Sequence, residues 1–160
     1  MRAKALLMAA LTAVLAALAC GPSTPTVNPV KQQVLTGTIG GQPFTFQSGT
    51  ASGSKVFGND GGEKWIDVYD APAIDCSVFS PGAQRELLGT IPWQVKDYDL
   101  NLVHNLTLLS MGSHNDIATS GRVEIVSAPP PDAGPATIRI RAYFDADNTV
   151  EGEVQLQVCD

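Results

Sequence analysis

Apolar and polar residues alternate strictly near the end of the chain, in two runs that flank a short acidic turn. The runs cover residues 138–144 and 150–158, and Asp145–Thr149 lies between them. A period of two places every second side chain on the same face of a β-strand. The two runs therefore predict an antiparallel hairpin with one buried face.

The turn predicts the register of this hairpin. Pairing Asp145 with Thr149 leaves a three-residue loop in which Asn148 takes the left-handed conformation. Both the apolar face and the charged face agree with this register, and a slip of one residue would disrupt both. The predicted cross-strand neighbours are Phe144 with Val150, Ile140 with Val154, and Arg141 with Glu153.

From Val34 onward the chain shows turn residues and short alternating runs, without helical periodicity. Gly40 and Gly41 predict a tight turn in an opening hairpin, and the Pro-rich segment 128–135 predicts a loop. Pro92 predicts that its strand lies at an edge or breaks there. Further strands are expected at 64–69, 75–79, 86–95, 102–111 and 121–126. Together these signals predict one all-β domain over 34–160, an antiparallel β-sandwich or flattened barrel of about eight strands.

The start of the chain has the pattern of a secretory signal peptide. Arg2 and Lys4 precede an apolar run from Ala5 to Ala19. This run is shorter than the roughly 20 residues that a membrane-spanning helix needs. Residues 1–19 are therefore predicted to be removed on export.

Residues Ala17–Cys20 resemble the lipobox of bacterial lipoproteins, although that family usually has Leu where Ala17 stands and a small residue where Leu18 stands. The resemblance implies that Cys20 becomes the first mature residue and carries fatty acids such as palmitate. Two or three acyl chains would hold the protein permanently at a membrane. Gly21 replaces the Asp that favours inner-membrane retention in enteric bacteria, so the analogy implies the outer membrane, with the periplasmic or surface face left open.

The segment that follows, residues 20–33, is rich in Pro and small polar residues and is predicted to be a flexible tether. Loss of Arg2 and Lys4 leaves 8 basic and 16 acidic side chains in the mature chain. The resulting negative charge argues against a nucleic-acid partner, because it repels phosphate.

Cysteine usage agrees with export. If Cys20 is acylated, Cys76 and Cys159 remain as an even pair in an oxidising compartment, which predicts a disulfide between them. The alternative is a pair of free or metal-binding thiols, but neither cysteine has a CxxC motif or a nearby histidine. Cys159 lies on the polar face of its strand, so we expect either a bend or bulge at the end of the strand or a disulfide at the rim of the sheet.

No catalytic motif occurs in the sequence, and no catalytic residue or cofactor is predicted. The two histidines are His104 and His114, and there is no GxSxG, HExxH, Walker or dinucleotide fingerprint. A possible ligand-binding row is Trp65, Asp67 and Tyr69, whose aromatic faces and carboxylate would suit a glycan if exposed. Core packing is the alternative for this row, and Trp93 and Tyr98 could extend it.

Oxygen-bearing side chains gather at the tip of the C-terminal hairpin. Asp145, Asp147, Asn148 and Glu151 are weak candidates for a calcium site. The spacing lacks the Gly and the distal Glu of an EF-hand, and the same residues are favoured in turns for backbone reasons. Asn59, Asp60 and Glu63 form a second acidic group with the same two interpretations.

Several segments resemble a group of small, mostly uncharacterised lipoproteins of Gram-negative bacteria. The shared features are the Leu35–Phe44 opening hairpin, a mid-chain cysteine, the Ile91–Trp93 and Ser120–Ile125 strands, and the Gly152–Cys159 strand. The resemblance implies an all-β domain, but its motifs are structural and do not indicate any activity. We expect a non-enzymatic binding or scaffolding protein of the envelope with an unknown protein or glycan partner; the alternatives are a glycan- or calcium-binding module and a hydrolase with an unrecognised site.

Overall fold

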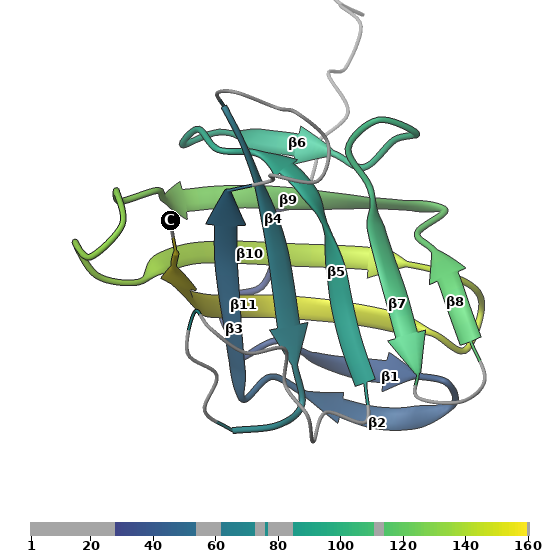
Figure 1. Cartoon of the computed structure of the whole chain (residues 1–160). Coiled ribbons are helices and arrows are strands. Elements are labelled where there is room, and N and C mark those ends of the chain that lie inside the picture. Colours follow the sequence, from purple (N-terminus) through teal and green to yellow (C-terminus); the bar gives the residue numbers. More distant parts are fainter. Residues whose placement is uncertain (1–27, 54–61, 73–75, 77–84, 111–113, 160) are drawn as a thin grey trace, which may run out of the picture.

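The part of the chain that the structure describes folds into β-strands and their connections (Figure 1). A computed structural model describes residues 28–53, 62–72, 76, 85–110 and 114–159. This confirms the predicted all-β class, whereas the predicted count of about eight strands is wrong, because the described residues form eleven. None of these residues forms a helix long and apolar enough to cross a membrane. The strands are Thr36–Ile39 (β1), Gln42–Thr45 (β2), Ser48–Gly53 (β3), Glu63–Tyr69 (β4), Arg85–Pro92 (β5), Asp97–Asp99 (β6), Leu106–Ser110 (β7), His114–Ile117 (β8), Ser120–Ser127 (β9), Ala136–Tyr143 (β10) and Thr149–Val158 (β11).

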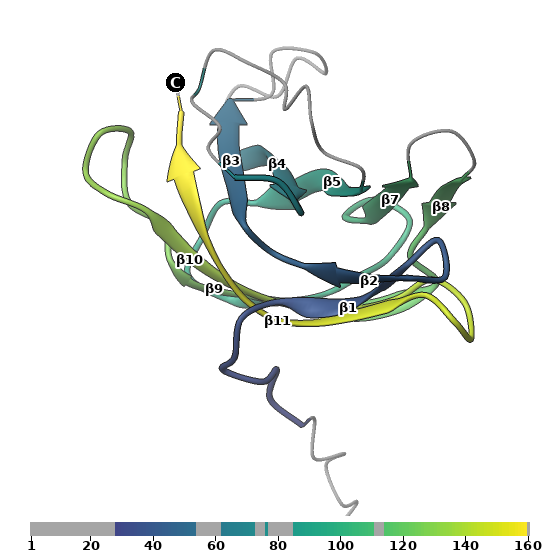
Figure 2. The ribbon, with the colours of Figure 1, turned by 90° about the horizontal axis from the view of Figure 1, so that it is seen from below.

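All eleven strands belong to one sheet, which curls into a half-barrel (Figure 2). The main path runs β6-β9-β10-β11-β3-β4-β5-β7-β8, and β1 pairs with both β11 and β2. The long strand β11 joins the two halves, since its first part pairs with β10 and β1 while Gln157 and Val158 pair with β3. The β11–β3 contact is parallel, unlike the antiparallel pairs along the rest of the path.

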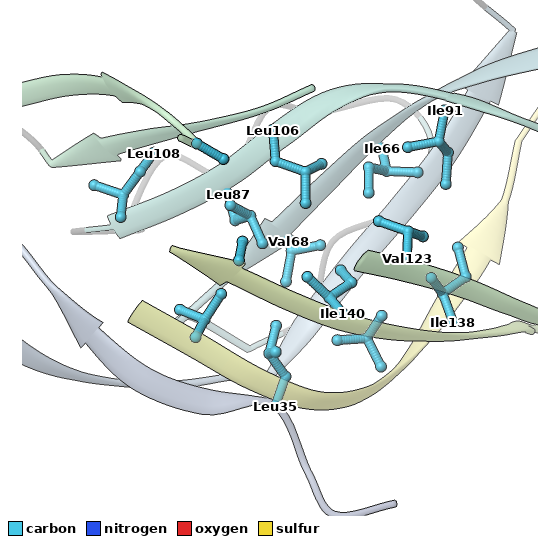
Figure 3. Close-up of a cluster of buried hydrophobic side chains, with 14 of the residues drawn as sticks. Leu35, Ile66, Val68, Leu87, Ile91, Leu106, Leu108, Val123, Ile138 and Ile140 are labelled. Atoms are coloured by element: carbon cyan, nitrogen blue, oxygen red, sulfur yellow. The ribbon is translucent and has the colours of Figure 1, made fainter. Parts of the chain in front are cut away.

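The concave side of the curled sheet holds the hydrophobic core (Figure 3). Side chains from both halves point into the same interior and are almost completely buried. Each fully buried aliphatic side chain stabilises the fold by about 1.5–3 kcal/mol relative to exposure. The core residues labelled in Figure 3 are Leu35, Ile66, Val68, Leu87, Ile91, Leu106, Leu108, Val123, Ile138 and Ile140.

The C-terminal hairpin forms, but its predicted register is wrong by two residues. Tyr143 pairs with Thr149, so the loop has five residues, and the left-handed Asn148 is not found. A shift of two keeps every side chain on its predicted face. It also improves the charged face, because Arg139 lies opposite Glu153 and Arg141 opposite Glu151. Both pairs form ion pairs, with N–O distances of 3.0 and 2.6 Å.

The other strand predictions have mixed outcomes. The opening hairpin is confirmed, with Gly40 and Gly41 at positive φ in the turn between β1 and β2. Pro92 ends β5, which lies inside the sheet rather than at its edge. The segment 128–135 is a connection, as predicted. β3, β6 and β8 were not predicted, and the strand expected at 75–79 falls outside the described residues except for Cys76, which lies in a turn.

The predicted disulfide between Cys76 and Cys159 is present. Its Cα atoms are 5.6 Å apart, and it closes a loop with a sequence separation of 83. Cys159 follows directly after β11, where its N–H donates to the Ala51 carbonyl at 2.8 Å. The disulfide therefore lies at the end of the strand, at the rim of the sheet as expected.

Residues 28–33, predicted as part of the tether, pack against the outer face of the sheet. Arg141 of β10 donates to the carbonyl oxygens of Asn28 and Pro29 at 3.0 and 2.7 Å. The Val30 N–H donates to Glu124 of β9 at 3.0 Å, and Val30 is buried. These contacts extend the folded part of the chain to Asn28.

Lys31 continues this contact one strand further along. Its Nζ lies 2.8 Å from Glu151 of β11. Burial alone would raise the pKa of Glu151, but hydrogen bonds from Lys31 and Arg141 outweigh it and lower that pKa. The N-terminal segment thus supplies the positive charge of Lys31, which pairs with the carboxylate of Glu151 in β11.

Candidate functional site

Among the described residues, a cluster of hydrogen-bonded polar and aromatic side chains lies on the outer face of β3, β4 and β5. The register places Thr50 opposite Asp67 and Tyr69 opposite Glu86, so these side chains share one face. Asp67, Tyr69 and Thr50 are buried, although they lie on the face away from the core. We call Thr50, Trp65, Asp67, Tyr69 and Glu86 the outer-face cluster.

Two carboxyl groups in this cluster are hydrogen-bonded to each other. Burial raises the pKa of Asp67, while hydrogen bonds with Trp65, Glu86 and Thr50 lower it. The indole Nε1 of Trp65 donates to Asp67 Oδ1 at 2.7 Å. Burial, and next the charge of Asp67, raise the pKa of Glu86 to about 7. The pair therefore holds one proton below neutral pH, because two close carboxylates resist double ionisation.

The predicted glycan-binding row of Trp65, Asp67 and Tyr69 does not form an exposed aromatic surface. Tyr69 is 3% exposed and Asp67 7%, while Trp65 is partly exposed. Trp93 and Tyr98 pack against the hydrophobic core instead of extending the row. A sugar stacks on an exposed ring, and of the two aromatic side chains in the row only that of Trp65 is partly exposed. The sequence pattern correctly grouped the three side chains but missed Glu86, because cross-strand partners cannot be read from one strand.

The carboxyl pair predicts a pH-dependent stability. The pKa of Glu86 in the folded chain, about 7, lies above its ordinary value of 4.5. The folded state therefore binds the proton more tightly, and this stabilisation is complete below pH 4.5 and lost as the pH rises through 7. Because Glu86 is partly exposed, we expect a loss on the order of 1–3 kcal/mol between pH 4.5 and pH 8.

Urea unfolding of the wild type and of Glu86→Gln at these two pH values measures the effect. The Gln side chain can donate to Asp67 at both pH values, so the variant should lack this component of the pH dependence. Glu153→Gln, which removes a carboxylate outside the cluster, serves as the control and should retain it. Equal pH dependence in the wild type and Glu86→Gln would contradict the shared proton.

A polar groove of about 550 Å³ lies beside the outer-face cluster. It is lined by the start of β3, the end of β11 and the β9–β10 connection. Amide groups dominate the lining, through Gln47, Gln155 and Gln157, with Asp132 as its carboxylate. Amides both donate and accept hydrogen bonds, so this surface suits a polar ligand without a negative charge.

Some of the groove's polar side chains also organise its walls. Gln47 Nε2 donates to the Asp70 carbonyl at 2.8 Å, and Ser48 Oγ donates to the Ala71 carbonyl at 2.6 Å. Gln155 exchanges hydrogen bonds with Thr137, whereas Gln157 is exposed to solvent. Gln157 is thus well placed to meet a ligand. No local sequence pattern predicts this groove, because its three segments are distant along the chain.

The weak calcium candidates at the hairpin tip are used by the turn itself. Asp145 Oδ1 accepts the N–H groups of Asp147 and Asn148 at 2.7 and 2.8 Å, and its Oδ2 accepts Asn148 Nδ2 at 2.7 Å. Glu151 pairs with Arg141 and Lys31 instead. Among the described residues, no group of three or more His, Cys, Asp or Glu side chains could hold a metal ion. In the second acidic group, Asn59 and Asp60 lie outside the described residues.

His104 contacts Glu63 at the start of β4. Its Nε2 lies 3.0 Å from Glu63 Oε1. The centroid of its ring lies 6.4 Å from that of Tyr98, and the two ring planes are inclined at 54°. This contact ties the β6–β7 connection to β4. The backbone of His114 begins β8, and its side chain, like Cys20, lies outside the described part of the chain.

No known protein family, curated protein or solved structure matches this chain.

Proposed function

We propose that this protein is a lipoprotein of the bacterial cell envelope, anchored in the outer membrane through acylated Cys20, with a non-enzymatic binding role. The observation that carries the proposal is the pairing of its cysteines. The chain has three, and the disulfide uses Cys76 and Cys159. Structural disulfides are typical of exported proteins, and Cys20 is left at the lipobox-like position for acylation.

The docked N-terminal segment supports a domain held close to the membrane. Because the chain is folded from Asn28 onward, the link from Cys20 is shorter than the sequence suggested. Residues 20–27 would span about 25 Å if they were extended in a polyproline-like conformation. The anchor would therefore restrict both the distance and the orientation of the domain.

The polar groove supports the binding role. It has the size of a small-ligand site, and the exposed Gln157 lies within its lining. The outer-face cluster beside it has its carboxyl groups bonded to each other and to Trp65, which is an arrangement that holds structure together. We therefore assign binding to the groove and a structural role to the cluster.

One experiment in bacterial cells tests both parts. The chain is expressed with an alkyne fatty acid in the medium and a photoreactive side chain at position 157. Matched strains carry Cys20→Ala, or the photoreactive side chain at Thr45, an exposed residue of β2. We expect fatty-acid label on every chain except Cys20→Ala. We also expect a crosslinked envelope component from position 157 and none from position 45.

The two readouts fail separately. Label that persists in Cys20→Ala would overturn the anchor. Identical crosslinking patterns from positions 157 and 45 would overturn the groove as the binding surface, whatever the outcome of the labelling.

A further inference from the structure

The connection between β6 and β7 displays two large aliphatic side chains to solvent. Leu102 is 98% exposed and Val103 76%. The turn that carries them is well defined: Asn101 Oδ1 accepts the N–H groups of Val103 and His104 at 2.8 and 3.1 Å, and the Asn101 N–H donates to the His104 carbonyl at 3.0 Å. Hydrogen bonds at its base thus hold the apolar tip outward. We call residues 101–104 the apolar turn.

The apolar turn lies at one edge of the sheet, and the N-terminal segment contacts the strand next to that edge. It follows β6, the first strand of the sheet path (Figure 1). β6 pairs with β9, and Glu124 of β9 accepts the Val30 N–H at 3.0 Å. The N-terminal segment therefore contacts the strand that pairs with β6 at this edge. Val95, in the connection that enters β6, is 67% exposed and adds a third apolar side chain.

The acidic groups of this edge are paired with a cation. Arg122 of β9 contacts Asp97 at 2.5 Å and Asp99 at 3.2 Å. Lys96 lies next to them in the sequence. Arg122 and Lys96 offset the charges of Asp97 and Asp99, which lowers the cost of bringing these two carboxylates close to lipid headgroups.

We infer that the apolar turn inserts into the bilayer that holds the anchor, with Leu102 and Val103 at the boundary between headgroups and acyl chains. The inference rests on the proposed acylation of Cys20. Residues 20–27 would reach about 25 Å in a polyproline-like conformation, which keeps the domain close to the membrane. Exposed aliphatic side chains on a firm turn gain from burial in the interface, as the apolar faces of interfacial segments do.

Fluorescence quenching tests this contact in the full lipidated chain. Leu102→Trp is placed in vesicles of phosphatidylethanolamine and phosphatidylglycerol whose acyl chains are brominated. Thr45→Trp, in the β2 strand at the opposite side of the molecule, is the control (Figure 1). Trp65 and Trp93 give the same background in both. We expect bromine to remove most of the added emission at position 102 and little at position 45.

The possible failures are distinct. A chain that floats with the vesicles but shows equal quenching at both positions retains its anchor and overturns the membrane contact of the turn. A chain that carries no lipid and does not float overturns the proposed anchor, and the inference that depends on it. If Leu102→Trp fails to fold by circular dichroism, Val103→Trp replaces it and must give the same quenching.

Discussion

Replacing Cys76 and Cys159 together by Ser is expected to lower the free energy of unfolding by about 4 kcal/mol. The disulfide closes a loop with a sequence separation of 83, so its removal frees a long stretch of the unfolded chain. It also places one polar side chain at the buried position of Cys159. A domain of this size is stable by only about 5–15 kcal/mol, so the variant should be close to its unfolding limit at 37 °C.

Urea unfolding of the mature chain, produced without lipid, measures this effect. Reduction of the wild type with dithiothreitol should reproduce most of it, and Cys20→Ser should leave the free energy of unfolding unchanged, since Cys20 is not part of the disulfide. A double variant within 1 kcal/mol of the wild type would mean that the bridge constrains neither the folded nor the unfolded chain, contrary to about 4 kcal/mol expected for such a loop.

The sequence predicted faces better than partners. Alternation placed Ile138, Ile140 and Val154 on the buried face correctly, because side-chain direction depends only on the local period of the strand. The register depended on the turn, where the Asp145 carboxylate accepts two backbone N–H groups and stabilises a longer loop. The correct register could be predicted only with the hydrogen bonds of the turn and with the two Arg–Glu pairs, Arg139 with Glu153 and Arg141 with Glu151.

Strand β3 shows the opposite problem. Its sequence, Ser-Gly-Thr-Ala-Ser-Gly, has neither large apolar residues nor alternation, and its place in the sheet comes from its neighbours. Gly49 illustrates why: a Cβ there would lie 2.5 Å from the Asp67 carbonyl oxygen and 2.6 Å from Leu156 Cδ2. Small residues are needed where β3 passes between β4 and the end of β11. A local pattern gives no signal for such a tertiary constraint.

The sequence predicted only part of the outer-face cluster, because pairing between strands cannot be read from a local pattern. Trp65, Asp67 and Tyr69 share one strand, so their common face followed from the sequence. Glu86 joins them only through the pairing of β4 with β5.

The composition of residues 28–33 likewise predicted a tether, because Pro and small polar residues cannot build a core. Their actual position depends on Arg141, more than 100 residues away in the sequence.

Gly152 is the second feature of the fold that a single substitution should test strongly. It lies in β11 at a φ of +149°, where the N-terminal segment crosses the strand. A Cβ at this position would lie 2.5 Å from Leu35 Cα and 2.6 Å from the Gln33 carbonyl oxygen. Both contacts are with backbone atoms, so a rotation of side chains cannot relieve them.

Gly62→Ala provides the matched control for Gly152→Ala. Gly62 has a similar φ of +133°, but a Cβ there meets nothing within 4 Å. The control should therefore show the backbone strain alone, about 1–2 kcal/mol. Gly152→Ala should lose about 1–3 kcal/mol more from the added collision. Chemical denaturation of the two variants measures the difference.

Hydrogen exchange shows where the additional loss arises. In the wild type the Leu35 N–H donates to the Glu153 carbonyl at 3.0 Å and the Val30 N–H donates to Glu124 at 3.0 Å. In Gly152→Ala these two amides should exchange much faster, because the crossing segment must lift from β11, whereas in Gly62→Ala they should stay protected. Unchanged protection of both amides in Gly152→Ala would mean that the sheet moves instead of the segment. The docked N-terminal segment would then be an integral part of the β-domain, and the start of the tether would be fixed more firmly than its sequence suggests.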